Sequence, residues 1–157
     1  MGGPAIEMRR ANSGGRPVVA PDMSERDFDF WAGVWECTWE GGRGKNTVEW
    51  ICGGRVLRES FDASQHGLIG TSISVHDGAA GRWVQTWMDS EGSWFHLDGM
   101  MRDGAMELVT TAPDAEGYRK RMRFADIQRD SLRWTWSRAL DGSVWEPLWE
   151  IDYRRAS

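Results

Sequence analysis

Short strand-like runs separated by turn dipeptides dominate this sequence, and they argue against a helical fold. Apolar and polar residues alternate over short stretches, and after residue 35 no long stretch holds the 3.6-residue period of a helix. Dipeptides such as Gly53-Gly54, Asp77-Gly78 and Asp103-Gly104 separate the stretches and favour the primed turns of β-hairpins. The predicted strands cover residues 33–40, 47–52, 55–62, 68–76, 82–89, 93–101, 105–111, 118–126, 132–139 and 144–155.

Consecutive strands joined by short turns form an antiparallel meander. A meander of this length closes on itself, because closure leaves no unpaired edge strand. Before the first strand, Ser24 followed by Asp27 is typical of the start of a helix. We therefore predict an all-β fold, a closed up-and-down antiparallel barrel of eight to ten strands with a short N-terminal helical turn within residues 25–31.

The chain of 157 residues has room for one domain of ordinary size. Residues 1–22 hold three prolines among glycines and are predicted to form a flexible N-terminal arm, with residues 23–157 forming the barrel domain. The arm lacks the sustained apolar stretch of a secretory signal. Cys37 and Cys52 lie on neighbouring predicted strands in a poor geometry for a disulfide, so we expect two reduced thiols and a cytoplasmic protein.

The charge balance narrows the range of partners. Nineteen Lys and Arg residues against 24 Asp and Glu residues give a net charge of −5, which argues against a general affinity for nucleic-acid phosphates. The basic run over residues 118–124 is interpreted as a solvated outer face. No apolar run approaches the length of a membrane span. We expect neither a nucleic-acid nor a membrane partner.

The two-residue period of a strand assigns the first three predicted strands to a common inner face. That inner face carries Trp35, Cys37, Trp39, Val48, Trp50, Cys52, Leu57, Glu59 and Phe61. Glu59 is then a carboxylate in an apolar lining, which requires either a polar partner or a raised pKa.

The strands between residues 68 and 111 present two faces that periodicity alone cannot tell apart. One face gathers tryptophans and polar groups: Ser72, Ser74, His76, Trp83, Gln85, Trp87, Asp89, Trp94, His96 and Asp98. The other is aliphatic and aromatic: Ile73, Val75, Val84, Met88, Phe95, Leu97, Met101 and Leu108. Hydrophobicity favours the second face as the core, whereas a barrel wide enough to hold a ligand favours the first.

The stretch Phe28-Asp29-Phe30-Trp31-Ala32-Gly33-Val34-Trp35 resembles the opening of the lipocalin-like calycin barrels. It is most similar to a bacterial branch that opens F-D-F-W-x-G-x-W. Three further stretches match that branch, over residues 53–61, 81–89 and 145–154, so the resemblance spans residues 28–155. It implies structural roles for Gly33 and Trp35, with a basic residue of the last strand, Arg154 or Arg155, packed over the indole.

The resemblance also bears on the undecided faces. The branch has a Gln-x-Trp-x-Asp pattern, here Gln85, Trp87 and Asp89, and often a basic residue at the position of Val84. Since a basic residue belongs outside, Gln85, Trp87 and Asp89 are expected inside. The expected ligand-binding residues are Glu59, Gln85, Trp87, Asp89, Trp94, His96 and Glu150.

Eleven tryptophans against five phenylalanines and two tyrosines give two hypotheses about the barrel interior. Indoles can simply fill a core, or they can line a cavity that stacks a flat or cationic organic ligand. We expect the protein to bind a small, largely apolar aromatic molecule. The alternatives are a cofactor-independent enzyme (a cyclase, isomerase or dehydratase) using the same cavity, then haem binding, then a purely structural module.

For an enzyme, His96 is the candidate acid–base group, with Asp89 near it, on the expectation that His96 pairs with Trp87 across a hairpin. Glu59 and Glu150 could flank the cavity, or a carboxylate could be buried against Arg138 for structural reasons. The histidines lack metal-ligand spacing, so no metal and no cofactor is expected. A homodimer is expected if Ile73, Val75, Val84, Met88, Phe95 and Leu97 form an outer apolar patch.

Overall fold

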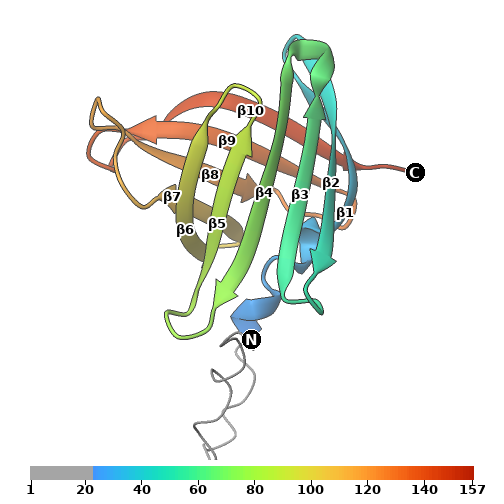
Figure 1. Cartoon of the computed structure of the whole chain (residues 1–157), viewed down its shortest axis with the longest axis horizontal. Helices are drawn as coiled ribbons and strands as arrows, with labels where there is room; N and C mark the ends of the chain where they lie inside the picture. Colours follow the sequence, from blue (N-terminus) through green and yellow to red (C-terminus); the bar gives the residue numbers. More distant parts are fainter. Residues whose placement is uncertain (1–22) are drawn as a thin grey trace, which may run out of the picture.

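The computed structural model describes residues 23–157 and shows a closed antiparallel barrel of ten strands (Figure 1). The strands follow one another around the barrel in chain order, and β1 pairs with β10 to close it. The predicted fold class is therefore confirmed, and the expected arm over residues 1–22 lies outside the described residues. The strands are β1 (Gly33–Trp39), β2 (Gly42–Ile51), β3 (Val56–Ala63), β4 (Leu68–Asp77), β5 (Arg82–Asp89), β6 (Trp94–Arg102), β7 (Ala105–Thr110), β8 (Arg119–Ala125), β9 (Ser131–Ala139) and β10 (Glu146–Arg155).

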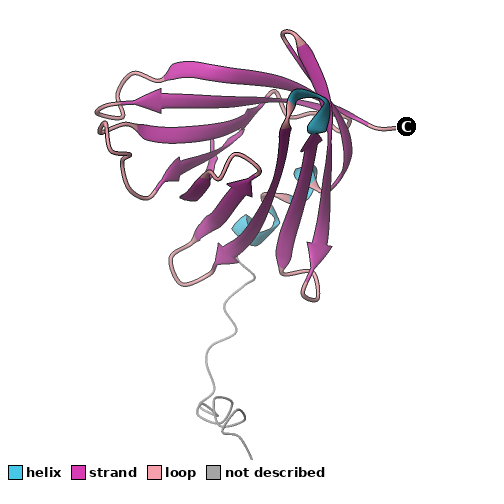
Figure 2. Ribbon diagram, turned by 45° about the horizontal axis from the view of Figure 1, so that its top comes forward, coloured by secondary structure: helices cyan, strands magenta, loops and turns pink. Residues whose placement is uncertain are grey.

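Two short 3-10 helices, η2 (Met23–Arg26) and η3 (Asp29–Trp31), stand where a helical turn was predicted. They lie at one end of the barrel, and η4 (Ser64–His66) lies at the other (Figures 1 and 2). Phe28 and Trp31 are fully buried, and the ring of Phe28 meets that of Phe124 edge-on at 5.2 Å. The indole N–H of Trp83 donates to the carbonyl of Ser24 at 3.0 Å. Aromatic side chains thus close this end of the barrel, which we call the plug end.

Trp35 links the plug to the first and last strands. Its indole N–H donates to the carbonyl of Trp31 at 2.8 Å, and its ring is covered by the guanidinium of Arg155, whose Cζ lies 4.1 Å from the ring centroid. Of the two candidates it is Arg155 that covers the indole, whereas Arg154 points outward, because Arg154 falls on the other face of β10. Gly33 is required at its position, since a Cβ there would lie 2.3 Å from Nη1 of Arg155.

The faces of the first three strands are as predicted. In the register of β1 with β2, Trp35 opposes Asn46 and Gly33 opposes Val48, and Cys37 is buried on this inner face. Leu57, Glu59 and Phe61 of β3 are also buried. One residue departs from the prediction: Cys52 is exposed, because β2 ends at Ile51 and Cys52 belongs to the turn.

In β4 and β5 the face rich in tryptophan and polar groups points inward. Ser72, Ser74 and Gln85 are completely buried, while Val75 and Met88 are exposed. The Nε2 of Gln85 donates to the hydroxyl of Ser74 at 2.8 Å, which satisfies one polar group of this unusual core with another. The inward placement of Gln85, Trp87 and Asp89 is therefore confirmed for these two strands.

In β6 the predicted faces are reversed. Leu97 is buried and Phe95 partly buried, while His96 and Trp94 are exposed, Trp94 to 71%. The cause is the loop between β5 and β6. It has three residues between Asp89 and Ser93, whereas the expected pairing of His96 with Trp87 requires a loop of two residues. Its last residue, Gly92, has a φ of 81°, as expected in a three-residue hairpin. One extra loop residue turns every side chain of the following strand to the other face.

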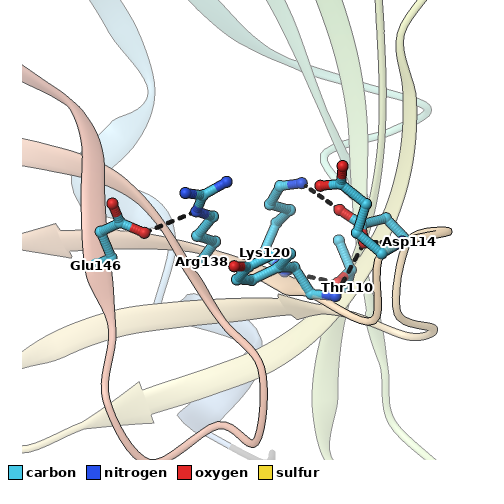
Figure 3. A network of polar contacts seen from close by, with 7 residues as sticks. Thr110, Asp114, Lys120, Arg138 and Glu146 are labelled. Atoms are coloured by element: carbon cyan, nitrogen blue, oxygen red, sulfur yellow. Dashed lines mark hydrogen bonds and ion pairs between the residues drawn. The ribbon is translucent and has the colours of Figure 1, made fainter.

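Two carboxylates, Asp114 and Glu107, pair with basic side chains of β8. Lys120 is held on both sides: its backbone N–H donates to Thr110 Oγ1 at 3.0 Å and its Nζ lies 2.7 Å from Asp114 Oδ2 (Figure 3). Close by, Arg138 Nε donates to Glu146 at 2.7 Å. Arg121 and Arg123 both face Glu107. These pairings agree with a structural role for the run.

Replacing Trp35 by alanine should destabilise the barrel strongly. The substitution removes a fully buried indole together with its hydrogen bond to Trp31 and its contact with Arg155. We expect the free energy of unfolding to fall by about 3–5 kcal/mol, as for large aromatic truncations in cores. Urea titration followed by circular dichroism measures it. Val144→Ala, at a side chain that is 78% exposed in the loop before β10, is the control and should change stability by less than about 0.5 kcal/mol. A loss under about 1 kcal/mol for Trp35→Ala would contradict the packing described.

The homodimer remains a prediction, with a different patch from the one expected. Phe95 and Leu97 face inward, and the exposed apolar side chains on the outer face of β4 to β6 are Ile69, Ile73, Val75, Met88, Trp94 and Met100. Light scattering at micromolar concentration should give the mass of a dimer, and Ile73→Lys, at the middle of β4, should give a monomer. A monomeric unmodified protein would show that this face stays exposed to solvent.

Candidate functional site

A cavity of about 220 Å³ lies inside the barrel between the plug end and the loop that joins β5 to β6. Four indoles from three strands line it: Trp87 of β5, Trp134 and Trp136 of β9, and Trp149 of β10. Trp31 and Phe124 line it from the plug end, and Glu91 and Ser93 from the loop. The cavity is therefore an aromatic pocket that reaches from the plug to the opposite end of the barrel.

The indoles are held in two orientations. Trp134 and Trp136 are parallel, with an interplanar angle of 2° and ring centroids 6.2 Å apart. The ring of Trp149 is nearly perpendicular to that of Trp134, at 88° and 5.8 Å. The alternation in β9 and β10 brings these three side chains to the inner face, where Trp149 is the register partner of Trp136. The wall thus offers ring faces in two directions.

Trp87 is fixed by a glycine and a carboxylate. Its six-membered ring lies over Gly70 of β4, where a Cβ would come within 2.2 Å of the indole, so only glycine fits. Its Nε1 donates to Asp89 Oδ2 at 2.9 Å. Asp89 also accepts the backbone N–H groups of Glu91 and Ser93, each at 3.0 Å. Burial opposes ionisation of Asp89, but these hydrogen bonds outweigh it, and the pKa of Asp89 lies below its usual value. Asp89 therefore positions the loop and the indole.

Glu59 is the buried carboxyl group of the cavity. It is 6% exposed, and both of its oxygens accept hydrogen bonds, Oε1 from Asn46 Nδ2 at 2.8 Å and Oε2 from Ser72 Oγ at 2.5 Å. Burial raises the pKa of Glu59 to about 7, against the lowering effect of these two hydrogen bonds. A carboxyl group with this pKa can give up or take a proton near neutral pH.

The polar network continues from Glu59 to the first and last strands. Asn46 Nδ2 lies 3.2 Å from the hydroxyl of Tyr153, which also lines the cavity. Burial, with neighbouring Cys37 and Glu59, raises the pKa of Tyr153 well above its usual value. Burial likewise raises the pKa of Cys37, which is hydrogen-bonded to Tyr153, to about 12. The phenol and the thiol are thus neutral around Glu59, and no cation balances the carboxylate in this network.

Two atoms of this region have no hydrogen-bond partner among the described residues. They are Asn46 Oδ1 and the indole nitrogen of Trp31, both buried. Trp31 lines the cavity, whereas Asn46 lies behind Glu59. The unpartnered amide oxygen leaves Asn46 able to turn its amide around if the group opposite it changes from an acceptor to a donor.

The structure brings together only part of the predicted site. Glu59, Trp87 and Asp89 line the cavity, while Gln85 is buried but bonded to Ser74 and does not reach it. The expectation that Trp94, His96 and Glu150 also line it is wrong, since all three are exposed on the outside of the barrel.

The predicted acid–base group is not assembled. His96 was expected opposite Trp87, but the partner of Trp87 is Phe95. His96 instead lies on the outer face, with its Nδ1 3.0 Å from the hydroxyl of Thr86, so it is neither near Asp89 in the cavity nor available there as a haem ligand. Glu150 falls on the outer face because Trp149 and Ile151 on either side of it point inward. The buried carboxylate is not paired with Arg138, which binds Glu146.

Sequence reasoning missed the wall opposite Trp87. Trp134, Trp136, Trp149 and Tyr153 were not singled out, although the alternations Trp-x-Trp in β9 and Trp-x-Ile-x-Tyr in β10 carry the signal. Asn46 could not be found in this way, because an asparagine next to a turn is usually a turn residue.

Comparison with protein-family models and with curated protein sequences finds no match to this chain. The calycin resemblance therefore stays an expectation, even though the contact between Trp35 and Arg155 is of the kind it implied. Among residues 23–157, no group of three His, Cys, Asp or Glu side chains is placed to hold a metal ion. Within the same range, the helices are all too short to cross a membrane.

Glu59 should make the stability of the free protein depend on pH. In the unfolded chain this carboxyl ionises near pH 4.5, but in the barrel only near pH 7, so ionisation favours the unfolded state over this interval. Glu59→Gln removes that effect, and Asn46 can turn its amide to accept from the new donor. We expect the free energy of unfolding of the variant, minus that of the parent, to be roughly 3 kcal/mol larger at pH 8 than at pH 4.

Urea unfolding at both pH values measures this difference. Glu150→Gln makes the same chemical change at an exposed carboxylate, and its difference from the parent should hardly vary with pH. If the stability difference between Glu59→Gln and the parent is also the same at both pH values, the pKa of Glu59 in the barrel is an ordinary one.

Proposed function

We propose that this protein binds a small, largely apolar aromatic molecule in the tryptophan-lined cavity of its barrel. The observation that carries the proposal is the wall itself, four indoles from three strands around a space that no side chain of the described residues fills. Indoles bury large apolar areas and stack on flat rings. A core built only for stability would be packed without such a space.

The cavity volume limits the size of the ligand. A volume of about 220 Å³ exceeds the roughly 150 Å³ that holds benzene in an engineered protein core. It is below the ~300 Å³ at which pockets for drug-sized molecules begin. The proposed ligand is therefore a molecule of one or two rings.

Polar groups at one side of the cavity would orient the ligand. Glu59 and Tyr153 present a carboxyl and a hydroxyl group to it, and each carboxyl oxygen has capacity beyond the bond it already accepts. Hydrogen bonds made there are stronger than in water because the surroundings are apolar. This anchoring role replaces the one expected for Gln85 and His96.

A second candidate is an enzyme that moves a proton without a cofactor, such as an isomerase, cyclase or dehydratase. The raised pKa of Glu59, to about 7, favours it, because a general acid or base works best with a pKa near the working pH. Glu59 would exchange the proton while the indoles hold the substrate in shape. The two candidates differ in what leaves the cavity: a binding protein releases the molecule unchanged, whereas an enzyme releases a product.

We also propose that the protein works in the cytoplasm. Both cysteines are free, Cys37 buried and Cys52 exposed, as is usual for proteins in a reducing compartment. Mass spectrometry of the native protein from cell extract, with and without thiol alkylation, checks this. In a reducing compartment the exposed Cys52 keeps a free thiol, so the alkylating reagent should modify it quantitatively.

Titration with one-ring and two-ring aromatic compounds should change the tryptophan fluorescence, and Trp87→Ala should weaken the response. Trp87 forms one wall of the cavity, and the loss of aromatic contact worth about 1.4 kcal/mol lowers affinity tenfold. The panel should include 2-phenylethanol, which does not absorb where tryptophan is excited selectively. Calorimetry then gives the dissociation constants.

Trp94→Ala is the matched control, since it removes an indole that is exposed on the outer face. It should leave the affinities unchanged. Equal weakening by both variants, or a panel without any binding compound, would contradict the proposed function. Native mass spectrometry of the purified protein provides an independent test by detecting any retained molecule.

A further inference from the structure

We infer that the ligand is a cation, a small aromatic molecule carrying a protonated amine, held between Glu59 and the faces of the surrounding indoles. The inference rests on the proposed binding function and names the chemical class of the ligand. It follows from the charges of the lining, from the arrangement of the rings and from the position of Glu59.

All charged side chains that line the cavity are acidic. Glu59 lies within it and Asp89 and Glu91 lie toward the loop end, while no Lys, Arg or His belongs to the described lining. The arginines near this part of the barrel are bound elsewhere, as Arg138 is to Glu146 and Arg155 is to Trp35. An anionic ligand would meet three carboxyl groups without a counter-charge, whereas a cation is attracted by each of them.

The indoles add a second attraction for a cation. The face of an indole carries negative electrostatic potential, and cages of aromatic rings bind organic ammonium groups for this reason. Trp134 and Trp149 stand at 88° to one another, so a group in the corner between them meets aromatic rings on two sides. Glu59 and Tyr153 line the same cavity as these two indoles.

Among residues 23–157, no cationic side chain forms a hydrogen bond or ion pair with Glu59, although a buried carboxylate is normally paired with one. Asn46 and Ser72 donate neutral hydrogen bonds to it, and burial still raises its pKa to about 7. An ammonium group bound beside it would supply the missing charge and stabilise the ionised carboxylate in a site of low dielectric. A neutral ligand gives no such compensation.

The groups that face Glu59 do not change their protonation state near neutral pH, whereas Glu59 does. Cys37 of β1 has a pKa of about 12 and Tyr153 of β10 one well above its usual value, so both stay neutral between pH 5 and pH 8.5. Asn46 of β2 and Ser72 of β4 do not titrate. Asp89 has a lowered pKa and is ionised throughout this range. A change in ligand affinity between pH 5 and pH 8.5 therefore reports mainly on Glu59.

Three probes of the same skeleton test the inference: 2-phenylethylamine, 2-phenylethanol and phenylacetate, which carry an ammonium, a hydroxyl and a carboxylate. Calorimetry at pH 8.5 should show the amine binding at least tenfold more tightly than the alcohol, and phenylacetate most weakly. An alkyl ammonium stays protonated at this pH. On acidification to pH 5 the affinity for the amine should fall by about two orders of magnitude, following the ionised fraction of Glu59, while that for the alcohol should not fall.

Glu59→Gln should abolish both the preference for the amine and its pH dependence. The alcohol serves as the control for folding, since its affinity for the variant should stay within about threefold of the parent value. Glu150→Gln makes the same change at an exposed position on the outer face of β10, away from the cavity lining, and should keep both the preference for the amine and the steep pH dependence.

The possible failures are distinguishable. If the alcohol binds as tightly as the amine and Trp87→Ala weakens both, the cavity binds aromatic molecules but the inference of a cationic ligand is wrong. If phenylacetate binds most tightly, the inference is wrong as well. If none of the three probes binds and the wider aromatic panel is silent, the proposed function fails together with the inference.

Discussion

The guanidinium of Arg155 is the contact on which the closed barrel depends most. It comes from the last strand, covers the indole of Trp35 on the first strand, and donates to the carbonyls of Ala32 at 2.8 Å and Phe30 at 3.1 Å. One side chain thus joins both ends of the meander to the plug. Since the plug residue Trp31 also lines the cavity, the position of the cavity wall depends on the same contact.

Most of the fold could be predicted from the sequence because turn chemistry and alternation are local signals. The ten predicted strands match the observed ones to within a few residues, except that β2 begins at Gly42, five residues before its predicted start. Part of the candidate site was predicted too, namely Glu59, Trp87 and Asp89. The two-residue alternation of strand side chains, followed from Trp35 through the first two turns, was enough to place Glu59 inside. Its need for a polar partner or a raised pKa follows from its burial.

Trp94 and His96 were misplaced at one loop. Asp89 accepts hydrogen bonds from the backbone N–H groups of Glu91 and Ser93, and this carboxylate helps to fix a hairpin loop of three residues, whereas the expected pairing of His96 with Trp87 requires a loop of two. The error of one residue exchanged His96 for Phe95 on the inner face. The partners of Glu59 could not be predicted either, because Asn46 and Ser72 meet it only across the sheet, where the register of three strands determines the contact.

Register also explains why a carboxyl group can persist in this core. Glu59 stands opposite Ser72 in the pairing of β3 with β4, and Asn46 lies two pairs along in the pairing of β2 with β3. These neighbours provide hydrogen bonds without charge, so the carboxyl is satisfied as a hydrogen-bonding group but not balanced as an ion. A glutamine could be accommodated at lower electrostatic cost if the barrel only had to fold. Glu59 is hydrogen-bonded but has no counter-charge among the described residues, and it faces an aromatic cavity. A cation bound in that cavity would supply the counter-charge. This is the physical basis for proposing that Glu59 serves ligand binding and not folding.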